Sequence, residues 1–124
     1  MQFSNNYLRG VQDEYFKLQW GTLLLALEPR FGGDLDMQGI LFVVGLQELG
    51  HGFKEYGKDE KMNIMHVAIC SLLEPFGYYE YEGLDAEQWP HWKATSKLPS
   101  LKPGQQQRLM QEAIIEYFEK GGLI

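Results

Sequence analysis

The chain has 124 residues, a length typical of a single domain, and 44% of them are hydrophobic, which argues against intrinsic disorder. Its 17 acidic residues outnumber its 11 Lys and Arg residues, so the formal net charge is −6. Nucleic acid and anionic membranes bind through clustered positive charge, and the chain has no stripe rich in Lys or Arg, so we expect neither as a partner.

We also expect neither a membrane span nor a disulfide. The longest apolar run, residues 40–46, is seven residues long, whereas a membrane-spanning helix needs about 20. Cys70 is the single cysteine, so no intrachain disulfide can form. The opening residues lack the apolar stretch of a secretory signal. The expectation is a cytoplasmic protein with one helical domain over residues 1–124.

The first predicted helix begins at Ser4 or Asn5, because a side-chain oxygen there can accept an unpaired backbone N–H. Around this cap, large apolar residues recur at three- and four-residue steps, as on one helix face that would share in the core. These residues are Phe3, Tyr7, Leu8, Val11, Tyr15 and Leu18. Residues 23–27 can extend the helix past Gly21, and Pro29, followed by Gly32 and Gly33, is expected to stop it.

A second helix is predicted after Asp34 or Asp36, either of which can serve as its N-cap. Residues 40–46 are apolar all round, so this segment should lie near the centre of the domain. The β-branched pair Val43 and Val44 leaves a buried strand as the alternative. We favour a helix because the apolar spacing extends on both sides of the run. Glycines in this helix, such as Gly45, suggest close packing against a neighbouring helix.

Two further helices complete the predicted architecture. The third begins near Asp59 and Glu60, acids that suit a helix N-terminus, and Pro75 ends it. The last follows Pro103 and has Gly121 as its C-cap. In this last helix Glu116 and Lys120 stand four residues apart and should form an ion pair.

The predicted fold class is therefore all-α. The four apolar faces can share one core as a four-helix bundle or as an irregular small helical array. One long aromatic-rich connection, residues 76–102, precedes the last helix.

This connection shows no sustained helical period, and irregular segments of such length are usually functional or disordered. Its many rings argue against disorder. Tyr79 and Tyr81 alternate with glutamates, a pattern that suits a short edge strand, but Gly83 breaks it. The region of Asp85 can open a helical turn, limited by Pro90.

Charge is sorted along the same region. Five acids and no bases occupy positions 74–87, and four bases and no acids occupy positions 93–108. Two such blocks can fold back on each other, or they can pair with the same blocks of a second copy.

The aromatic residues of the connection are the candidate interaction residues, because Trp and Tyr dominate interface hot spots. The alternative is that the rings close the open end of the helical bundle. The candidates are Tyr78, Tyr79, Tyr81, Trp89, His91 and Trp92.

Two pairs of residues are weak candidates for chemistry. Glu48 and His51 have the Glu-x-x-His spacing that can hold a metal on a helix, but the pattern occurs once and glycines flank the histidine. His66 and Cys70 stand four residues apart, so a histidine could activate the thiol; a buried histidine beside an inert cysteine is the stronger interpretation. The sequence therefore assigns no catalytic residue, metal site or cofactor.

Two functional hypotheses follow. The first is a non-enzymatic protein-interaction module or small adaptor that associates with itself, or with another protein, through the aromatic-acidic connection. The alternative is a domain that binds a small ligand or a metal, with possible catalysis, through Glu48, His51 and either His66 or His91.

Overall fold

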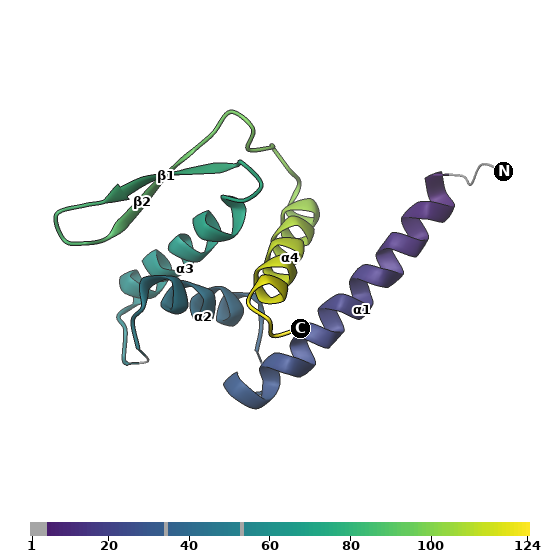
Figure 1. Ribbon diagram of the computed structural model, residues 1–124, viewed down its shortest axis with the longest axis horizontal. Helices are drawn as coiled ribbons and strands as arrows, with labels where there is room; N and C mark the ends of the chain where they lie inside the picture. The colour runs from purple at the N-terminus through teal and green to yellow at the C-terminus, as the bar shows by residue number, and fades with distance from the viewer. Residues whose placement is uncertain (1–4, 34, 53) are drawn as a thin grey trace. The chain divides into compact units, whose positions relative to one another are not determined.

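The computed structural model describes residues 5–33, 35–52 and 54–124 (Figure 1). The predicted caps Ser4 and Asp34 lie outside these residues. The described elements follow in the order α1 (Asn5–Phe31), α2 (Met37–Leu49), α3 (Lys58–Leu73), β1 (Tyr79–Leu84), β2 (Pro90–Ala94) and α4 (Pro103–Lys120). Within this part of the chain, no helix combines the length and the apolar character needed to cross a membrane.

The chain divides into two compact units. The terminal unit comprises the chain up to Leu35 together with Gln111–Ile124, and the central unit comprises Asp36–Met110. Buried residues of the terminal unit are Leu23, Leu27, Ala113, Ile114, Ile115 and Phe118. Those of the central unit are Ile40, Leu41, Val43, Val44, Leu46, Tyr56, Ile64, Val67, Ala68, Cys70, Leu72 and Leu73. None of the described polar or charged residues is buried.

Helix α1 carries apolar residues on two different sides. In the stripe predicted to enter the core, Val11 is 52% exposed, Tyr15 63% and Leu18 69%. The side chains of its other members, Phe3, Tyr7 and Leu8, lie outside the part of the chain that the structure describes. Leu23 and Leu27, which are buried, point to a different side of the helix, roughly 110° and 150° from the centre of Val11, Tyr15 and Leu18 at about 100° of rotation per residue. The assignment of Val11, Tyr15 and Leu18 to the core is therefore wrong. Apolar spacing identifies a helix face, but it does not say which of two such faces is covered.

Helix α1 also continues through Pro29, so the part of the stop signal that rested on this proline is wrong, whereas the part that rested on Gly32 is confirmed. Proline lacks one N–H group, but in the exposed last turn this removes only one helical hydrogen bond. The last helical residue is Phe31, and Gly32 follows it with a left-handed backbone (φ 98°) and donates its N–H to the Glu28 carbonyl at 2.9 Å.

Helix α2 forms as predicted, and the alternative of a buried strand is wrong. The Asp36 side chain accepts a hydrogen bond from the Gly39 N–H at 2.8 Å, which satisfies one unpaired donor at the helix start. Gly50 ends the helix in the left-handed region, with φ 71°. Residues 40–41 and 43–46 are buried, in agreement with an apolar run at the centre of its unit.

Helices α2 and α3 approach most closely at Gly45. A Cβ atom added there would press against the Ile64 carbonyl oxygen and lie 2.6 Å from Ile64 Cγ2. The glycine thus allows the backbone of α3 to lie directly against α2, which is the close packing that the sequence suggested. Helix α3 begins at Lys58, where the Gly57 N–H donates to Glu60 Oε1 at 3.1 Å.

Helix α4 has the predicted ends. Pro103 is its first residue, and Lys120 Nζ lies 2.7 Å from Glu116 Oε1. After the C-cap Gly121, Gly122 takes the left-handed conformation with φ 81°, and its N–H donates to the Glu119 carbonyl at 3.1 Å. This arrangement satisfies carbonyl groups that a helix end leaves unpaired.

The all-α fold class is wrong, because the aromatic-rich connection contains a β-hairpin (Figure 1). Strands β1 and β2 pair antiparallel, with Tyr81 opposite Trp92 and Leu84 opposite Pro90. The four helices and two strands of the described residues therefore make a small mixed fold. The edge strand suggested from Tyr79 is confirmed, but the helical turn suggested near Asp85 is wrong.

A bulge in β1 and an unusual turn explain why the hairpin was not recognised from the sequence. The register shifts between Tyr81 and Gly83, so the alternation of the strand breaks inside β1. The turn contains no glycine; instead Gln88 takes a left-handed backbone with φ 67°. Among the described residues, it is the only residue other than glycine with positive φ. A short-range hairpin signal normally requires glycine or asparagine there.

Replacing Gly45 tests the close approach of α2 and α3. We expect Gly45→Ala to lower the free energy of unfolding by about 1–3 kcal/mol, because the new methyl group overpacks against the α3 backbone. Gly21→Ala is the matched control: a Cβ there meets nothing within 4 Å, so alanine should stabilise the helix by up to about 1 kcal/mol. Urea denaturation measures both, and a Gly45→Ala protein as stable as the wild type would contradict the packing.

Candidate functional site

The hairpin has an apolar face and a polar face. Strand pairing places six mostly apolar residues on one side: Tyr79, Tyr81, Leu84, Pro90, Trp92 and Ala94. The opposite side carries Glu80, His91 and Lys93. We call the exposed large side chains of the apolar side, Tyr81 and Leu84, the hairpin patch.

Helix α3 anchors part of the apolar face. Trp92 Nε1 donates to Glu74 Oε1 at 2.7 Å, directly after the last residue of α3. Thr95 Oγ1 donates to the Gly77 carbonyl at 2.6 Å. Strand β1 contacts α3. Burial raises the pKa of the Tyr79 hydroxyl, and the neighbouring Cys70 raises it further. The base of the hairpin is thus held in a defined position.

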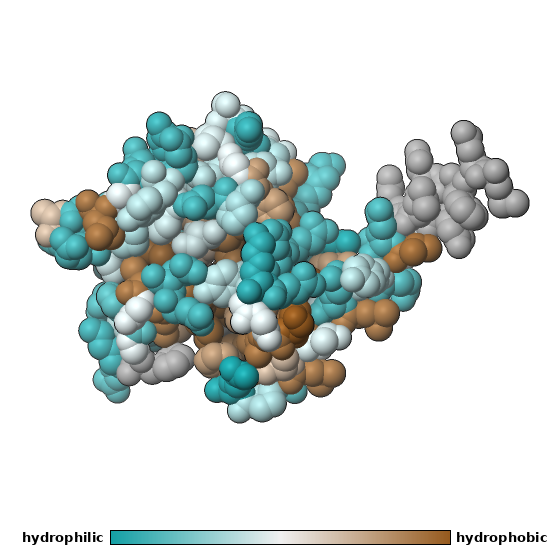
Figure 2. Space-filling model, viewed as in Figure 1, coloured by the Kyte–Doolittle hydropathy of each residue, from teal (hydrophilic) through white to brown (hydrophobic). Residues whose placement is uncertain are grey.

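The hairpin patch extends beyond this anchor. Tyr81 is 47% exposed and Leu84 is 56% exposed. The Tyr81 ring lies 5.3 Å from the Trp92 ring, in a tilted arrangement that supports it from its own sheet. In Figure 2 apolar surface appears at the left, where Figure 1 places the turn of the hairpin. The patch therefore presents apolar side chains to solvent on an ordered support.

Trp89 holds the tip of the hairpin against the α2–α3 part of the central unit. It packs against the buried cluster of Leu46, Tyr56 and Ile64. The centre of its ring lies 6.2 Å from that of the His51 ring. Trp89, a candidate interaction residue, and His51, a candidate metal ligand, are therefore neighbours. Trp89 therefore acts mainly in packing.

A shallow depression of about 170 Å³ lies beside this cluster. Its lining residues are His51, Lys54, Tyr56, Glu60, Asn63, Ile64 and Trp89. Sites for drug-sized ligands occupy about 300–1,000 Å³, so this depression accepts only a group of a few atoms. The Lys54 ammonium lies 5.2 Å from the centre of the Tyr56 ring, and the Tyr56 hydroxyl donates to the Gly52 carbonyl at 2.6 Å.

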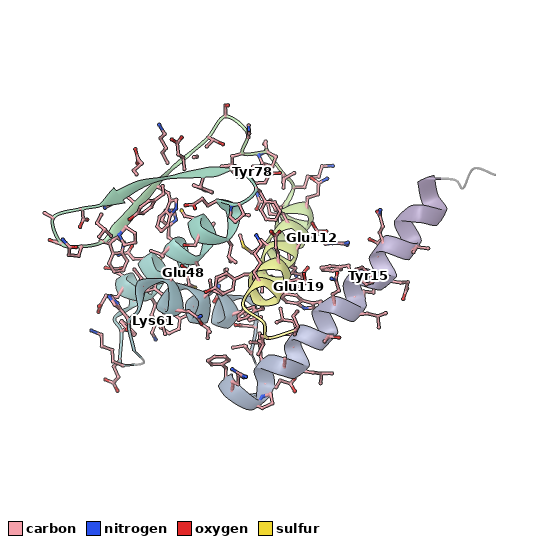
Figure 3. All side chains as sticks on the ribbon, viewed as in Figure 1. Tyr15, Glu48, Lys61, Tyr78, Glu112 and Glu119 are labelled. Atoms are coloured by element: carbon pink, nitrogen blue, oxygen red, sulfur yellow. The ribbon has the colours of Figure 1, made fainter. Side chains whose placement is uncertain are left out.

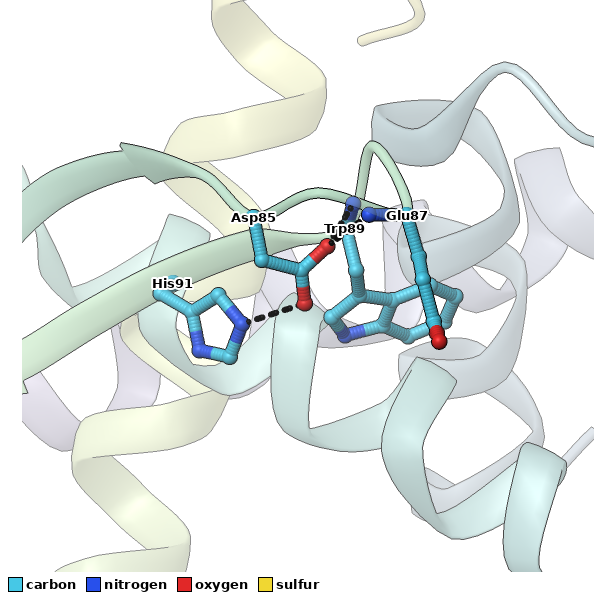
Figure 4. A network of polar contacts seen from close by, with 4 residues as sticks. All are labelled: Asp85, Glu87, Trp89 and His91. Carbon is cyan, nitrogen blue, oxygen red and sulfur yellow. Dashed lines mark hydrogen bonds and ion pairs between the residues drawn. The ribbon is translucent and has the colours of Figure 1, made fainter.

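Asp85 organises the turn of the hairpin (Figure 4). Its Oδ1 accepts hydrogen bonds from the N–H groups of Glu87 at 2.8 Å and Trp89 at 3.0 Å. Its Oδ2 lies 2.8 Å from His91 Nε2 on the polar face. The hydrogen bond from His91, followed by those from the backbone, holds the pKa of the Asp85 carboxyl below its ordinary value. These contacts explain how a turn without glycine is maintained.

The sorted charges fold back within the hairpin. Lys93 Nζ lies 3.9 Å from Glu80 Oε2 in the facing strand, and His91 meets Asp85. Both pairs are largely exposed, so they add little to stability. Glu80 and Lys93 are thus one pair between the two blocks that forms within the chain, whereas Asp85 pairs with His91, which belongs to neither block.

The six predicted interaction residues do not form one surface. Tyr81 and His91 are exposed, but they lie on opposite faces of the hairpin. The other four are half-buried: Tyr78, Tyr79, Trp89 and Trp92. Tyr78 stacks on Phe76 with the ring centres 5.9 Å apart. Most of these rings therefore cover helices of the central unit, and Tyr81 alone joins exposure to the apolar face.

The structure separates the two candidate metal ligands. Glu48 is exposed on α2 (Figure 3), and the helix ends one residue later at Leu49. Because Gly50 turns left-handed, His51 leaves the helix and does not share a helix face with Glu48. Within the described ranges, no group of three or more His, Cys, Asp and Glu side chains could hold a metal ion.

Cys70 and His66 meet, but the thiol is inert. Cys70 Sγ lies 3.6 Å from His66 Nε2. Cys70 is fully buried, and burial raises the pKa of its thiol to about 11, so the reactive thiolate is scarce at neutral pH. His66 is exposed, which differs from the expected buried histidine.

Sequence reasoning did not single out Lys54, Tyr56 or Asn63, which line the depression with the rings of His51 and Trp89. Three separate stretches of the chain form this wall. The sequence does not indicate that these three stretches meet, because none of the lining residues forms a motif with its sequence neighbours.

Comparisons with models of protein families, with curated proteins and with solved structures find no match to this chain.

The burial of Cys70 predicts slow thiol chemistry. A pKa of about 11 in place of 9.0 leaves about 100-fold less thiolate at pH 8. Alkylation by iodoacetamide should therefore be at least this much slower in the folded protein than in 6 M urea. An exposed cysteine introduced by Ser100→Cys is the control, and equal rates at both positions would show that the thiol is accessible.

The lowered pKa of Asp85 predicts how the turn responds to acid. The ionised carboxylate is favoured in the folded hairpin, so its contribution is present above the ordinary value of 3.8 and is lost as pH falls through the lowered value. NMR titration of the carboxyl carbon should give a midpoint below 3.8, and His91→Asn should move it upward. Glu87→Gln, which keeps the backbone donor, is the control and should leave it unchanged. A midpoint that His91→Asn does not move would contradict the assigned hydrogen bond.

Proposed function

We propose that the chain is a non-enzymatic protein-interaction module of the cytoplasm, and that the hairpin patch contacts a protein partner, either another protein or a second copy. The observation that carries the proposal is the exposure of Tyr81 and Leu84 on the apolar face of an anchored hairpin. Large apolar side chains on a rigid support lose little entropy on binding, which favours their use in interfaces. The cytoplasmic location rests on the single, free cysteine.

The charges on the strands favour a contact through the face of the hairpin over its edges. The sheet has two strands, and no third strand lies beside either of them in the described part of the chain. A two-fold pairing of edges would set β1 against β1, which brings Glu80 and Glu82 near their own copies. Charged edges of this kind discourage strand addition. The patch itself carries no charge, so it can be buried without this cost.

The alternative of a metal or small-ligand site has weaker support. Glu48 and His51 lie on different sides of a helix end, and the depression beside His51 is small. Neither arrangement brings together an acid, a base and a substrate-sized cavity, which an enzyme would need.

A double variant, Tyr81→Ser with Leu84→Ser, tests the proposal. Affinity purification of the tagged wild-type chain from its native cells should recover a stoichiometric partner or an untagged second copy. The variant should bind that partner at least about tenfold more weakly, because it removes the centre of the contact. Met62→Ser is the matched control, since Met62 is 58% exposed on α3. Equal recovery by all three proteins would remove the hairpin patch from the interface.

A further inference from the structure

The depression beside Trp89 is lined in part by buried apolar residues. Ile64 is 1% exposed and Tyr56 is 8% exposed, and both belong to the buried cluster against which Trp89 packs. The volume of the depression is about 170 Å³, and an apolar cavity of about 150 Å³ already holds a benzene ring. The depression therefore has room for one ring or one short aliphatic chain.

The acid that lines the depression is already engaged. Glu60 Oε1 accepts the Gly57 N–H at 3.1 Å. Glu60 also stands in the first turn of α3, where the positive end of the helix stabilises a negative charge. Its charge is therefore largely balanced within the chain.

The lysine of the depression is not balanced in this way. Lys54 Nζ lies 5.2 Å from the centre of the Tyr56 ring, and no carboxylate pairs with it within residues 5–33, 35–52 and 54–124. The exposed side-chain amide of Asn63 also has no hydrogen-bond partner in this part of the chain. Both groups can donate hydrogen bonds. The depression thus offers one positive charge and a second donor beside an apolar lining.

These groups favour a ligand with a single negative charge. A carboxylate beside Lys54 would form a charge-assisted hydrogen bond with an ammonium that otherwise has no anionic partner. A phosphate monoester carries close to two negative charges near neutral pH, whereas the lining contains one lysine. Aromatic rings also attract cations, but a cation here would meet the like charge of Lys54.

We therefore propose that this depression binds a small apolar carboxylate. Its ring or short chain packs on Ile64 and Trp89, and its carboxylate accepts hydrogen bonds from Lys54 and Asn63. The site is separate from the hairpin patch and does not depend on the proposed protein interaction. Lys54 is exposed and the net charge of the chain is −6, so the affinity should be modest, with a Kd of about 1 mM.

Titration of the full chain with benzoate, followed by two-dimensional NMR, tests the proposal. Benzoate should shift the indole N–H signal of Trp89 and the side-chain amide signal of Asn63, and both shifts should saturate together. The indole signals of Trp20 and Trp92, which do not line the depression, are internal references and should stay in place. Saturating shifts confined to residues outside the lining overturn the proposal.

Two related compounds test the chemistry of the ligand. Benzylamine is a cation of similar size at neutral pH, and acetate is a carboxylate without a ring. Each should bind at least about tenfold more weakly than benzoate, because each lacks one of the two required contacts. Benzylamine that binds as tightly as benzoate overturns the anionic ligand, and acetate that does so overturns the role of the apolar lining.

Replacing Lys54 tests the charge directly. Lys54→Gln should weaken benzoate binding at least about fivefold, because it removes the charge-assisted hydrogen bond. Binding of benzyl alcohol, which is neutral, should stay the same and shows that the depression is intact. Lys58→Gln is the matched control, since Lys58 is exposed near the depression but does not line it. An equal loss in both variants would trace the attraction to net charge and overturn the assignment to Lys54.

A free organic acid and the C-terminal residue of a peptide both present this chemistry. Acetyl-glycyl-glycyl-phenylalanine, compared with benzoate, distinguishes the two sources: tighter binding of the peptide indicates a chain terminus, and tighter binding of benzoate indicates a free acid. The same peptide with a C-terminal amide should not bind, and equal binding of acid and amide overturns the carboxylate.

The hairpin variant separates this site from the proposed interaction. Tyr81→Ser with Leu84→Ser should bind benzoate as the wild type does, even where it no longer recovers a protein partner. Loss of benzoate binding in this variant would overturn the independence of the two sites.

Discussion

The central unit depends on one close contact, the approach of α3 to α2 across Gly45. Only glycine leaves room there for the Ile64 backbone, and Ile64 is itself 1% exposed within the cluster that includes Leu46 and Tyr56. Trp89 packs on the same cluster from the tip of the hairpin. A shift of α3 away from α2 would therefore move the surface to which the hairpin is attached. The absence of a side chain at Gly45 therefore helps to determine where Trp89 packs, more than 40 residues later in the chain.

The hairpin illustrates how a short polar network can replace the usual turn chemistry. Gln88 takes a backbone conformation that costs most residues about 1 kcal/mol or more. Asp85 compensates through two backbone N–H donors and a histidine, all close in sequence. Trp92 and Thr95 then hold the strands to the end of α3. The result is a projecting element whose position is defined at both its turn and its base.

Helices were predictable from this sequence because their signals are local. Asp36, Gly50 and Pro103 act at helix ends through their own backbone and side-chain chemistry, and each does what its residue type suggests. The hairpin was only partly predictable, since the alternation around Tyr79 was visible but the bulge and the Gln88 turn concealed its partner strand.

The candidate site was less predictable than the fold, because burial depends on distant neighbours. The composition of the connection indicated aromatic residues but could not separate Tyr81, which faces solvent, from Trp89, which packs inward. The same limit applies to α1, where spacing identified the stripe of Val11 and Leu18 but not the fact that it is left uncovered. Contacts between segments that are remote in sequence decided both outcomes.

The position of Cys70 has a practical consequence for spectroscopy. It is the single cysteine of the chain, it is closed off by helix packing, and its thiol is protonated near neutral pH. A fluorophore or spin label can therefore be attached through a cysteine introduced at any exposed position without first removing the native one. Distances between labels could then be followed in a protein whose interior is unaltered.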